Sequence, residues 1–296
     1  DAAFGTTRLG PSGDVTAPTA PALTATATSP FSVDLSWTAS TDDTGVVAYD
    51  VTRDGVLVAT LDPGTLAWTD STVLASTTYQ YVVIARDAAA NVSAPATGPV
   101  QTPDAAAPLF SDGFESGTTA SWTTVTNLPV QSAAVHSGTF AAEGTAASTA
   151  GFAKKTVPSS SDAYARVAFD VISRTSAVTL LRLRTTPTGT GAFVSLTSTG
   201  KLQLKSDSVA TAVTSSVTPG AGWHVLELHV KVGPNGTDGA AEVWLDGAPV
   251  SELTFPTYNV GTAPMTSLQI GDTVATGTWD IAFDDAAFGT SRLGVS

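Results

Sequence analysis

The chain has 296 residues, no cysteine, a formal net charge of −13 and only 13% charged residues. Disulfides and thiolate metal sites are therefore excluded, and we expect no nucleic-acid and no membrane partner, because either would require a basic patch. The length fits two domains, and the abundance of Thr, Ser, Ala, Gly and Val indicates an all-β fold.

The first ten residues, DAAFGTTRLG, return at residues 285–294 as DAAFGTSRLG, and only Thr7 and Ser291 differ. A match of this kind predicts a tandem array with a period of 284 residues (285 minus 1). Residues 1–13 are then the last strand of a preceding repeat and a linker. The expected partners are neighbouring repeats or copies of the chain itself.

Residues 14–103 contain seven runs in which apolar and polar residues alternate. This alternation is typical of strands, and seven strands in so short a stretch predict a β-sandwich. Val47, Tyr49 and Val51 are expected to share the core face. Asp54-Gly55 predicts a two-residue hairpin turn with positive φ. The seven runs cover residues 22–28, 32–38, 46–53, 56–61, 67–70, 78–87 and 93–102.

Two segments of this domain carry a family resemblance. The run VDLSWTASTDDTGVVAYDVTRDGVLVATL at 33–61, followed by TTYQYVVIARDAAANVSAPA at 77–96, resembles the fibronectin type III domains of bacterial secreted proteins. The resemblance implies a spacer or interaction module without chemistry of its own. It also implies an extracellular or cell-surface location.

Residues 108–296 follow a short proline-bounded linker and again read as strands throughout. Thirteen runs suit two large antiparallel sheets joined by hairpins. We expect the first and last of them to pair. The runs cover residues 109–114, 133–136, 141–144, 151–157, 163–173, 178–185, 192–197, 201–205, 222–231, 239–245, 248–255, 267–271 and 279–288.

Four segments of this second domain resemble the laminin G-like and concanavalin A-like jelly-roll superfamily. The resemblance implies a larger antiparallel jelly-roll sandwich. The segments are LFSDGFESGTTASWTT from residue 109, FVSLTSTGKLQLKSDS from residue 193, GWHVLELHVKVGPNGTDGAAEVWLDGAPV from residue 222 and WDIAFDDAAFG from residue 279.

Basic residues alternate with leucines in two of the predicted strands. Because successive side chains of a strand point to opposite faces, the polar members form a basic stripe opposite the leucines. Such a stripe is suited to an acidic polysaccharide, and the alternative is the solvated outer face of an antiparallel sheet. An exposed tryptophan is a candidate platform for sugar stacking. The candidate carbohydrate-binding residues are Arg182, Arg184, Lys201, Gln203, Lys205 and Trp244.

Acidic residues stand at both ends of the second domain, where the first and last strands are expected to pair. Oxygen ligands at such a meeting suit a structural Ca²⁺, which related jelly-roll modules carry near this seam. The alternative is a set of solvated or capping carboxylates. The candidate ligands are Asp112, Glu115, Asp284 and Asp285.

No G-x-S-x-G, H-E-x-x-H or phosphate-loop motif occurs, so the sequence predicts no enzyme. The repeat and the resemblances favour a non-catalytic structural or adhesive unit of a bacterial cell-surface or secreted fibre. The first alternative is a carbohydrate-binding module for a polysaccharide, which would be acidic if the basic stripe binds it. The second is a polysaccharide lyase or hydrolase-like domain.

Overall fold

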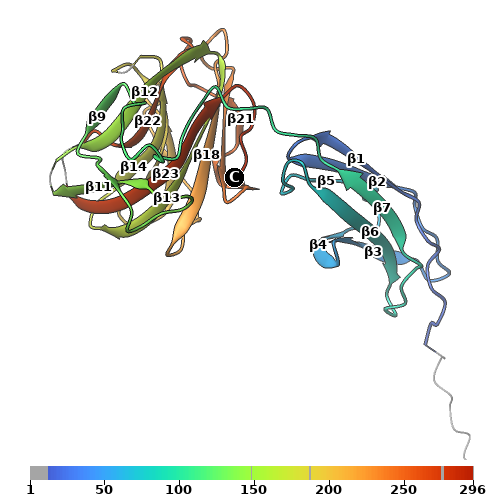
Figure 1. The fold of residues 1–296 in the computed structure, drawn as a ribbon. Helices are drawn as coiled ribbons and strands as arrows, with labels where there is room; N and C mark the ends of the chain where they lie inside the picture. Colours follow the sequence, from blue (N-terminus) through green and yellow to red (C-terminus); the bar gives the residue numbers. More distant parts are fainter. Residues whose placement is uncertain (1–12, 148, 187, 275–276, 296) are drawn as a thin grey trace, which may run out of the picture. The chain divides into compact units, whose positions relative to one another are not determined.

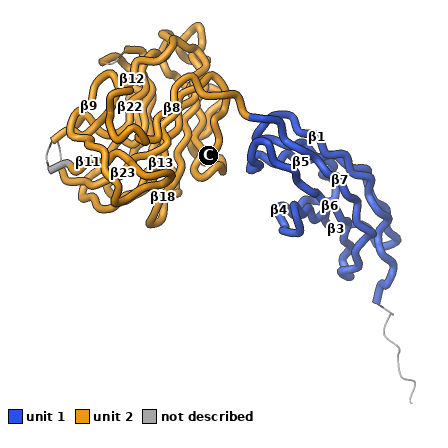
Figure 2. The backbone as a smooth tube through the Cα atoms, viewed as in Figure 1, with its two compact units in different colours: residues 1–104 blue, residues 105–296 orange. Residues whose placement is uncertain are grey.

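The computed structural model describes residues 13–147, 149–186, 188–274 and 277–295. The chain divides into two compact units, Asp1–Asp104 and Ala105–Ser296, which Figure 2 shows in blue and orange. Residues 1–10, predicted to be the last strand of a preceding repeat, lie outside the described residues. Within the described part of the chain no helix is long and apolar enough to cross a membrane.

The first unit is a sandwich of a three-stranded and a four-stranded antiparallel sheet, with orders β1-β2-β5 and β4-β3-β6-β7 (Figure 1). The seven strands therefore form the β-sandwich that the sequence predicts. The strands are β1 (Leu23–Ser29), β2 (Ser32–Trp37), β3 (Val46–Arg53), β4 (Val56–Leu61), β5 (Ala67–Asp70), β6 (Thr78–Asp87) and β7 (Ala96–Gln101).

The core of the first unit follows strand alternation with one exception. Tyr49 and Val51 are fully buried as expected, whereas Val47 is 43% exposed, so its core assignment is wrong. The cause is a register shift between Val46 and Ala48 in the β3–β6 pairing, which turns Ala48 inward instead. The predicted turn after β3 is present, with φ of 50° at Asp54.

The second unit is also built from strands, with one short 3₁₀ turn. Its elements are β8 (Phe110–Asp112), β9 (Thr124–Thr126), β10 (Val130–Gln131), β11 (Ala141–Ala147), β12 (Gly151–Ser160), β13 (Asp162–Arg174), β14 (Val178–Arg184), β15 (Gly191–Leu196), β16 (Leu202–Ser206), β17 (Val213–Thr214), β18 (Trp223–Lys231), β19 (Gly239–Leu245), β20 (Ala248–Pro249), η1 (Ser251–Leu253), β21 (Phe255–Tyr258), β22 (Met265–Asp272) and β23 (Thr278–Gly289).

These strands form two large antiparallel sheets. The nine-stranded sheet has the order β10-β11-β23-β13-β18-β19-β20, with β21 beside β19 and β8 beside β23, and the seven-stranded sheet has the order β17-β16-β15-β14-β22-β12-β9. The all-β class and the larger antiparallel sandwich are thus confirmed. The narrower jelly-roll and concanavalin A-like assignment stays a prediction.

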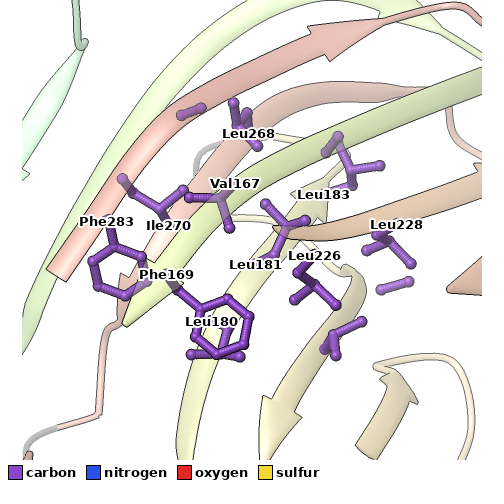
Figure 3. Close-up of a cluster of buried hydrophobic side chains, with 14 of the residues drawn as sticks. Val167, Phe169, Leu180, Leu181, Leu183, Leu226, Leu228, Leu268, Ile270 and Phe283 are labelled. Atoms are coloured by element: carbon purple, nitrogen blue, oxygen red, sulfur yellow. The ribbon is translucent and has the colours of Figure 1, made fainter. Parts of the chain in front are cut away.

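The core of the second unit lies between the two sheets. Figure 3 shows Phe169, Leu226 and Phe283 of the nine-stranded sheet close to Leu181 and Ile270 of the seven-stranded sheet. All five side chains are fully buried. Burial of this apolar surface, at about 25 cal/mol per Å², drives the two sheets together.

Two predicted strands of this unit are not formed as expected. Residues 133–136 form no strand, because the Gln131 side chain accepts a bond from the Ala134 amide and donates one to the Ala134 carbonyl, which closes a local turn. Residues 248–255 are interrupted by η1. The short strands β9 and β17 were not predicted, since two or three residues carry too little alternation to detect.

The last strand, β23, lies inside the nine-stranded sheet. It pairs with β13 on one side, and with β11 and β8 on the other. The expected pairing of first and last strands is present, since Ala286 lies opposite Asp112. This end of β23 therefore lies between β13 and β8 and is not at an edge of the sheet.

Candidate functional site

A row of five residues crosses the outer face of the seven-stranded sheet. Lys154 on β12 lies opposite Gln269 on β22, and Gln269 lies opposite Arg182 on β14. Arg182 lies opposite Phe193 on β15, which in turn faces Lys205 on β16. We call these residues the basic row. Of the predicted stripe, only Arg182 and Lys205 belong to this row, and their strands are not neighbours because β15 separates them.

Arg182 occupies the centre of the basic row. Its guanidinium lies 4.4 Å from the centre of the Phe193 ring, and it forms an ion pair with Asp207. Asp207 also accepts the backbone N–H of Gly191 at 2.9 Å. A planar guanidinium held over a ring presents both a charge and a flat surface.

The ammonium of Lys154 lies in a positive local field. Burial lowers its pKa, and the nearby charges of Arg184 and Arg182 lower it further. Three cations close together in a partly desolvated place stabilise an incoming anion, which would relieve their mutual repulsion.

Arg184 lies beside the basic row, two residues from Arg182 on β14 and on the same face. It is only 7% exposed, and its Nε donates to Gln269 Oε1 at 2.9 Å while its Nη1 donates to the Gly189 carbonyl at 2.8 Å. Burial, with the charge of Arg182, lowers its pKa to about 10. Gln269 is fully buried and donates to the Gly271 carbonyl. Arg184 and the row's own Gln269 are therefore turned away from solvent and position the exposed members of the row.

A pocket of about 280 Å³ adjoins the end of the row at Lys205. Gln203 lines it and donates to Thr214 Oγ1 at 2.7 Å. Asp272 also lines it, and its carboxylate accepts the backbone N–H groups of Thr179 and Val274. Lys201 is exposed and immediately precedes β16.

Trp244 lies on the other sheet, away from the basic row. It is on β19, is 8% exposed, and is covered by the guanidinium of Arg292 at 4.8 Å from the ring centre. Tyr164 stacks beside it at 6.4 Å. The expectation of an exposed tryptophan platform is therefore wrong, because the segment after β23 folds over this face.

Three members of the row were missed by sequence reasoning, namely Lys154, Phe193 and Gln269. Their side-chain alternation is visible in the sequence, but register between strands far apart in the chain decides that they meet Arg182.

The four predicted metal ligands lie on segments that meet at the β8–β23 pairing. Asp112 accepts from the Phe114 amide and the Trp122 indole at 2.9 and 2.8 Å. Glu115 accepts the amides of Thr139 and Phe140, each at 2.9 Å.

The two adjacent aspartates of this seam are also bonded to protein donors. Asp284 is fully buried and accepts the amides of His136, Ser137 and Asp285, and burial raises its pKa to about 6. Asp285, with φ of 47°, accepts from the His136 ring at 2.7 Å.

This donor set does not gather around one point. Among the described residues, only Asp14, Asp42 and Asp87 of the first unit place three ligand atoms within 4.8 Å of one another. The seam instead resembles the alternative of capping carboxylates. Calcium at the seam stays a prediction.

A second polar cluster occupies the outer face of the nine-stranded sheet. His229 is 6% exposed, and its ring nitrogens bond to Glu242 and Asp162, each at 2.7 Å. Tyr164 stacks on the imidazole at 4.1 Å. Burial lowers the pKa of His229, but its bonds to the two carboxylates raise it overall. Both ring nitrogens are engaged, so neither is placed for proton transfer to a substrate.

Short stretches of the chain are similar to parts of named exoglucanases and chitinases. No family model matches the chain. Over 118 residues it is 42% identical to Exoglucanase B of Cellulomonas fimi. This match covers 37% of this chain and 11% of that protein. Over 85 residues it is 53% identical to Chitinase A1 of Niallia circulans. This match covers 28% of this chain and 12% of that protein. The chain thus spans about a tenth of the length of these relatives.

Among solved structures, Cellulose induced protein, Cip1, is similar with a TM-score of 0.52 at 19% identity. The match covers 63% of this chain and all of that one. At this level of identity the likeness concerns the fold alone.

Proposed function

We propose that the chain is a non-catalytic accessory part of an extracellular polysaccharide-degrading system. In this proposal the second unit binds an acidic polysaccharide along the basic row, and the first unit is a spacer. The likeness to short stretches of an exoglucanase and a chitinase supports an accessory role, because so small a shared part leaves most of each relative unmatched.

The observation that carries the proposal is the regular placement of cations in the basic row. Lys154, Arg182 and Lys205 stand on every second strand, hence roughly 10 Å apart at the usual spacing of strands. A polymer with acidic groups repeating along its length matches such a row, and Phe193 adds a ring between two of the cations. Carboxylate groups would form charge-assisted bonds with the three cations.

The bonding of the two described carboxylates beside the row supports the non-catalytic part. Of the described carboxylates beside it, Asp207 pairs with Arg182 and Asp272 accepts two backbone N–H groups. No described histidine belongs to the row or lines its pocket. Acid–base cleavage would require a group free to move a proton.

Calorimetric titration of the chain with polygalacturonate tests the proposal, with dextran as the neutral polymer. Lys154→Ala and Lys205→Ala should each weaken binding about tenfold or more, and added salt should weaken it further. Lys201→Ala is the matched control, since it removes the same charge from an exposed position outside the row. Equal losses for Lys201→Ala, or binding to dextran alone, would refute an acidic ligand at the row.

A structural or adhesive role in a fibre is the second candidate. The near-identity of residues 1–10 and 285–294 favours it, because it predicts that units of this kind follow one another in a longer chain. The two roles are compatible, since repetition would multiply weak polysaccharide contacts.

A further inference from the structure

The segment that follows β23 is bound by side chains on the outer face of the nine-stranded sheet. Arg166 on β13, Glu227 on β18 and Trp244 on β19 form this site together with the carbonyl of Gly247. We call these four groups the tail clamp. Its occupant is the tripeptide Arg292-Leu293-Gly294.

Glu227 and Arg166 bind the main chain of the occupant. Glu227 Oε1 accepts the Leu293 amide at 2.6 Å, and Oε2 accepts the Gly294 amide at 3.3 Å. Arg166 Nη1 donates to the carbonyls of Leu293 and Gly294 at 3.4 and 3.2 Å. Donors and acceptors of two consecutive residues are therefore both recognised.

The side chains of the occupant are recognised separately. Arg292 Nη2 donates to the Gly247 carbonyl at 2.7 Å, and the same guanidinium lies 4.8 Å from the centre of the Trp244 ring. Leu293 is 8% exposed. Gly294 has φ of +69°, a conformation that strains any residue with a Cβ. Arginine, leucine and glycine are thus each required for a different physical reason.

Without an occupant, the tail clamp would hold two charged side chains away from water with fewer bonding partners, which is unfavourable in free energy. Glu227 is 2% and Arg166 8% exposed, and burial raises the pKa of Glu227 while it lowers that of Arg166. Both charges are therefore held away from water, and their bonds to the occupant's main chain offset part of that cost.

We propose that the tail clamp is a peptide-binding site that reads the sequence Arg-Leu-Gly, and that its second ligand is Arg8-Leu9-Gly10 of another copy of this chain. The two tripeptides are identical, and the residues before them, Gly5-Thr6-Thr7 and Gly289-Thr290-Ser291, differ only in the last. Residues 285–289 belong to the inner strand β23 and stay in place. Exchange therefore involves the tripeptide after the strand and not the strand itself.

The chain's own tail and the foreign segment compete for the clamp. A covalently attached segment has an effective concentration of the order of millimolar, so the tail excludes the second copy in a dilute, intact chain. Release of the tail makes the clamp available and joins one copy to the next through its N-terminal segment.

A fluorescein-labelled peptide of residues 4–12, FGTTRLGPS, is the probe. The acceptor is a full-length double variant, Leu293→Asp with Leu9→Asp, in which both internal copies of the ligand are impaired. Fluorescence anisotropy should rise to saturation with this acceptor and stay flat with the wild-type chain. The peptide with Leu9→Asp, and the acceptor with Glu227→Gln added, should bind about tenfold more weakly or worse.

A second acceptor, Gly294→Ala, tests the proposal if the Leu293→Asp, Leu9→Asp double variant is unfolded. Gly294→Ala strains only the backbone of the tail, and in it the peptide should accelerate hydrogen exchange of the Leu293 amide by displacing the tail. Light scattering should also show association of Leu293→Asp alone, which the added Leu9→Asp abolishes. A folded acceptor that does not bind the peptide, or equal binding of the Leu9→Asp peptide, overturns the proposal.

Discussion

The buried carboxylate Asp70 holds together one end of the first unit. Its side chain is 1% exposed and accepts four bonds, from Arg53 Nη1 at 2.6 Å, the Tyr81 hydroxyl at 2.8 Å, and the Thr72 amide and hydroxyl at 2.9 and 2.7 Å. Asp70→Ala leaves a guanidinium and a buried hydroxyl without their acceptor. Breaking a fully buried charged pair costs about 3–5 kcal/mol, but the Arg53 side chain is 23% exposed and also donates to Thr72, so we expect a loss of about 2–3 kcal/mol.

This loss should appear as a large shift in one thermal transition. In a unit of about a hundred residues, 1 kcal/mol corresponds to about 4–8 °C, so we expect the midpoint to fall by roughly 10–20 °C. Tyr81→Phe removes one donor while Arg53 still binds the carboxylate, and should cost only about 1.5 kcal/mol. The double variant, Asp70→Ala with Tyr81→Phe, should lose less unfolding free energy than the sum of the two single variants. The reason is that without the Tyr81 hydroxyl no phenol donor is left unpaired.

The pH dependence gives an independent check of the same network. Burial raises the pKa of Asp70, but the bonds from Thr72 and Tyr81 and the charge of Arg53 lower it overall, below its ordinary value of 3.8. The stabilisation is therefore present above that value and is lost as pH falls through the lowered pKa. The difference between wild type and Asp70→Ala should shrink in acid.

Differential scanning calorimetry of the whole chain measures these effects, because the transition of the second unit serves as an internal standard. A change below about 1 kcal/mol for Asp70→Ala at neutral pH would refute the argument, since an exposed pair is worth that little. A difference that grows on acidification would contradict the sign of the linkage.

Two further predictions concern the second unit. His229 has a raised pKa through Glu242 and Asp162, so its contribution is present below about pH 6.5 and lost as pH rises through the raised value; His229→Gln should therefore destabilise more near pH 5 than near pH 9 in thermal melts. If Ca²⁺ binds at the seam, excess Ca²⁺ should raise the melting midpoint relative to EDTA, and Asp285→Asn should abolish the rise while Asp14→Asn leaves it. An unmoved midpoint would remove the calcium prediction.

The sequence by itself determined the strands and their faces wherever alternation runs long enough. The bounds of β3, β4, β5 and β6 coincide with predicted runs, because a period of two and a turn such as Asp54-Gly55 are local properties of the chain. Leu181 and Leu183 are buried beneath Arg182 for the same reason.

Tertiary structure alone decided which strands are neighbours and what covers each face. Lys154 joins Arg182 across β22, and Phe193 separates Arg182 from Lys205, through registers that link distant segments. Trp244 is covered by Arg292 of a segment nearly fifty residues later in the chain. Such contacts depend on the summed packing of two sheets, and no local pattern encodes them.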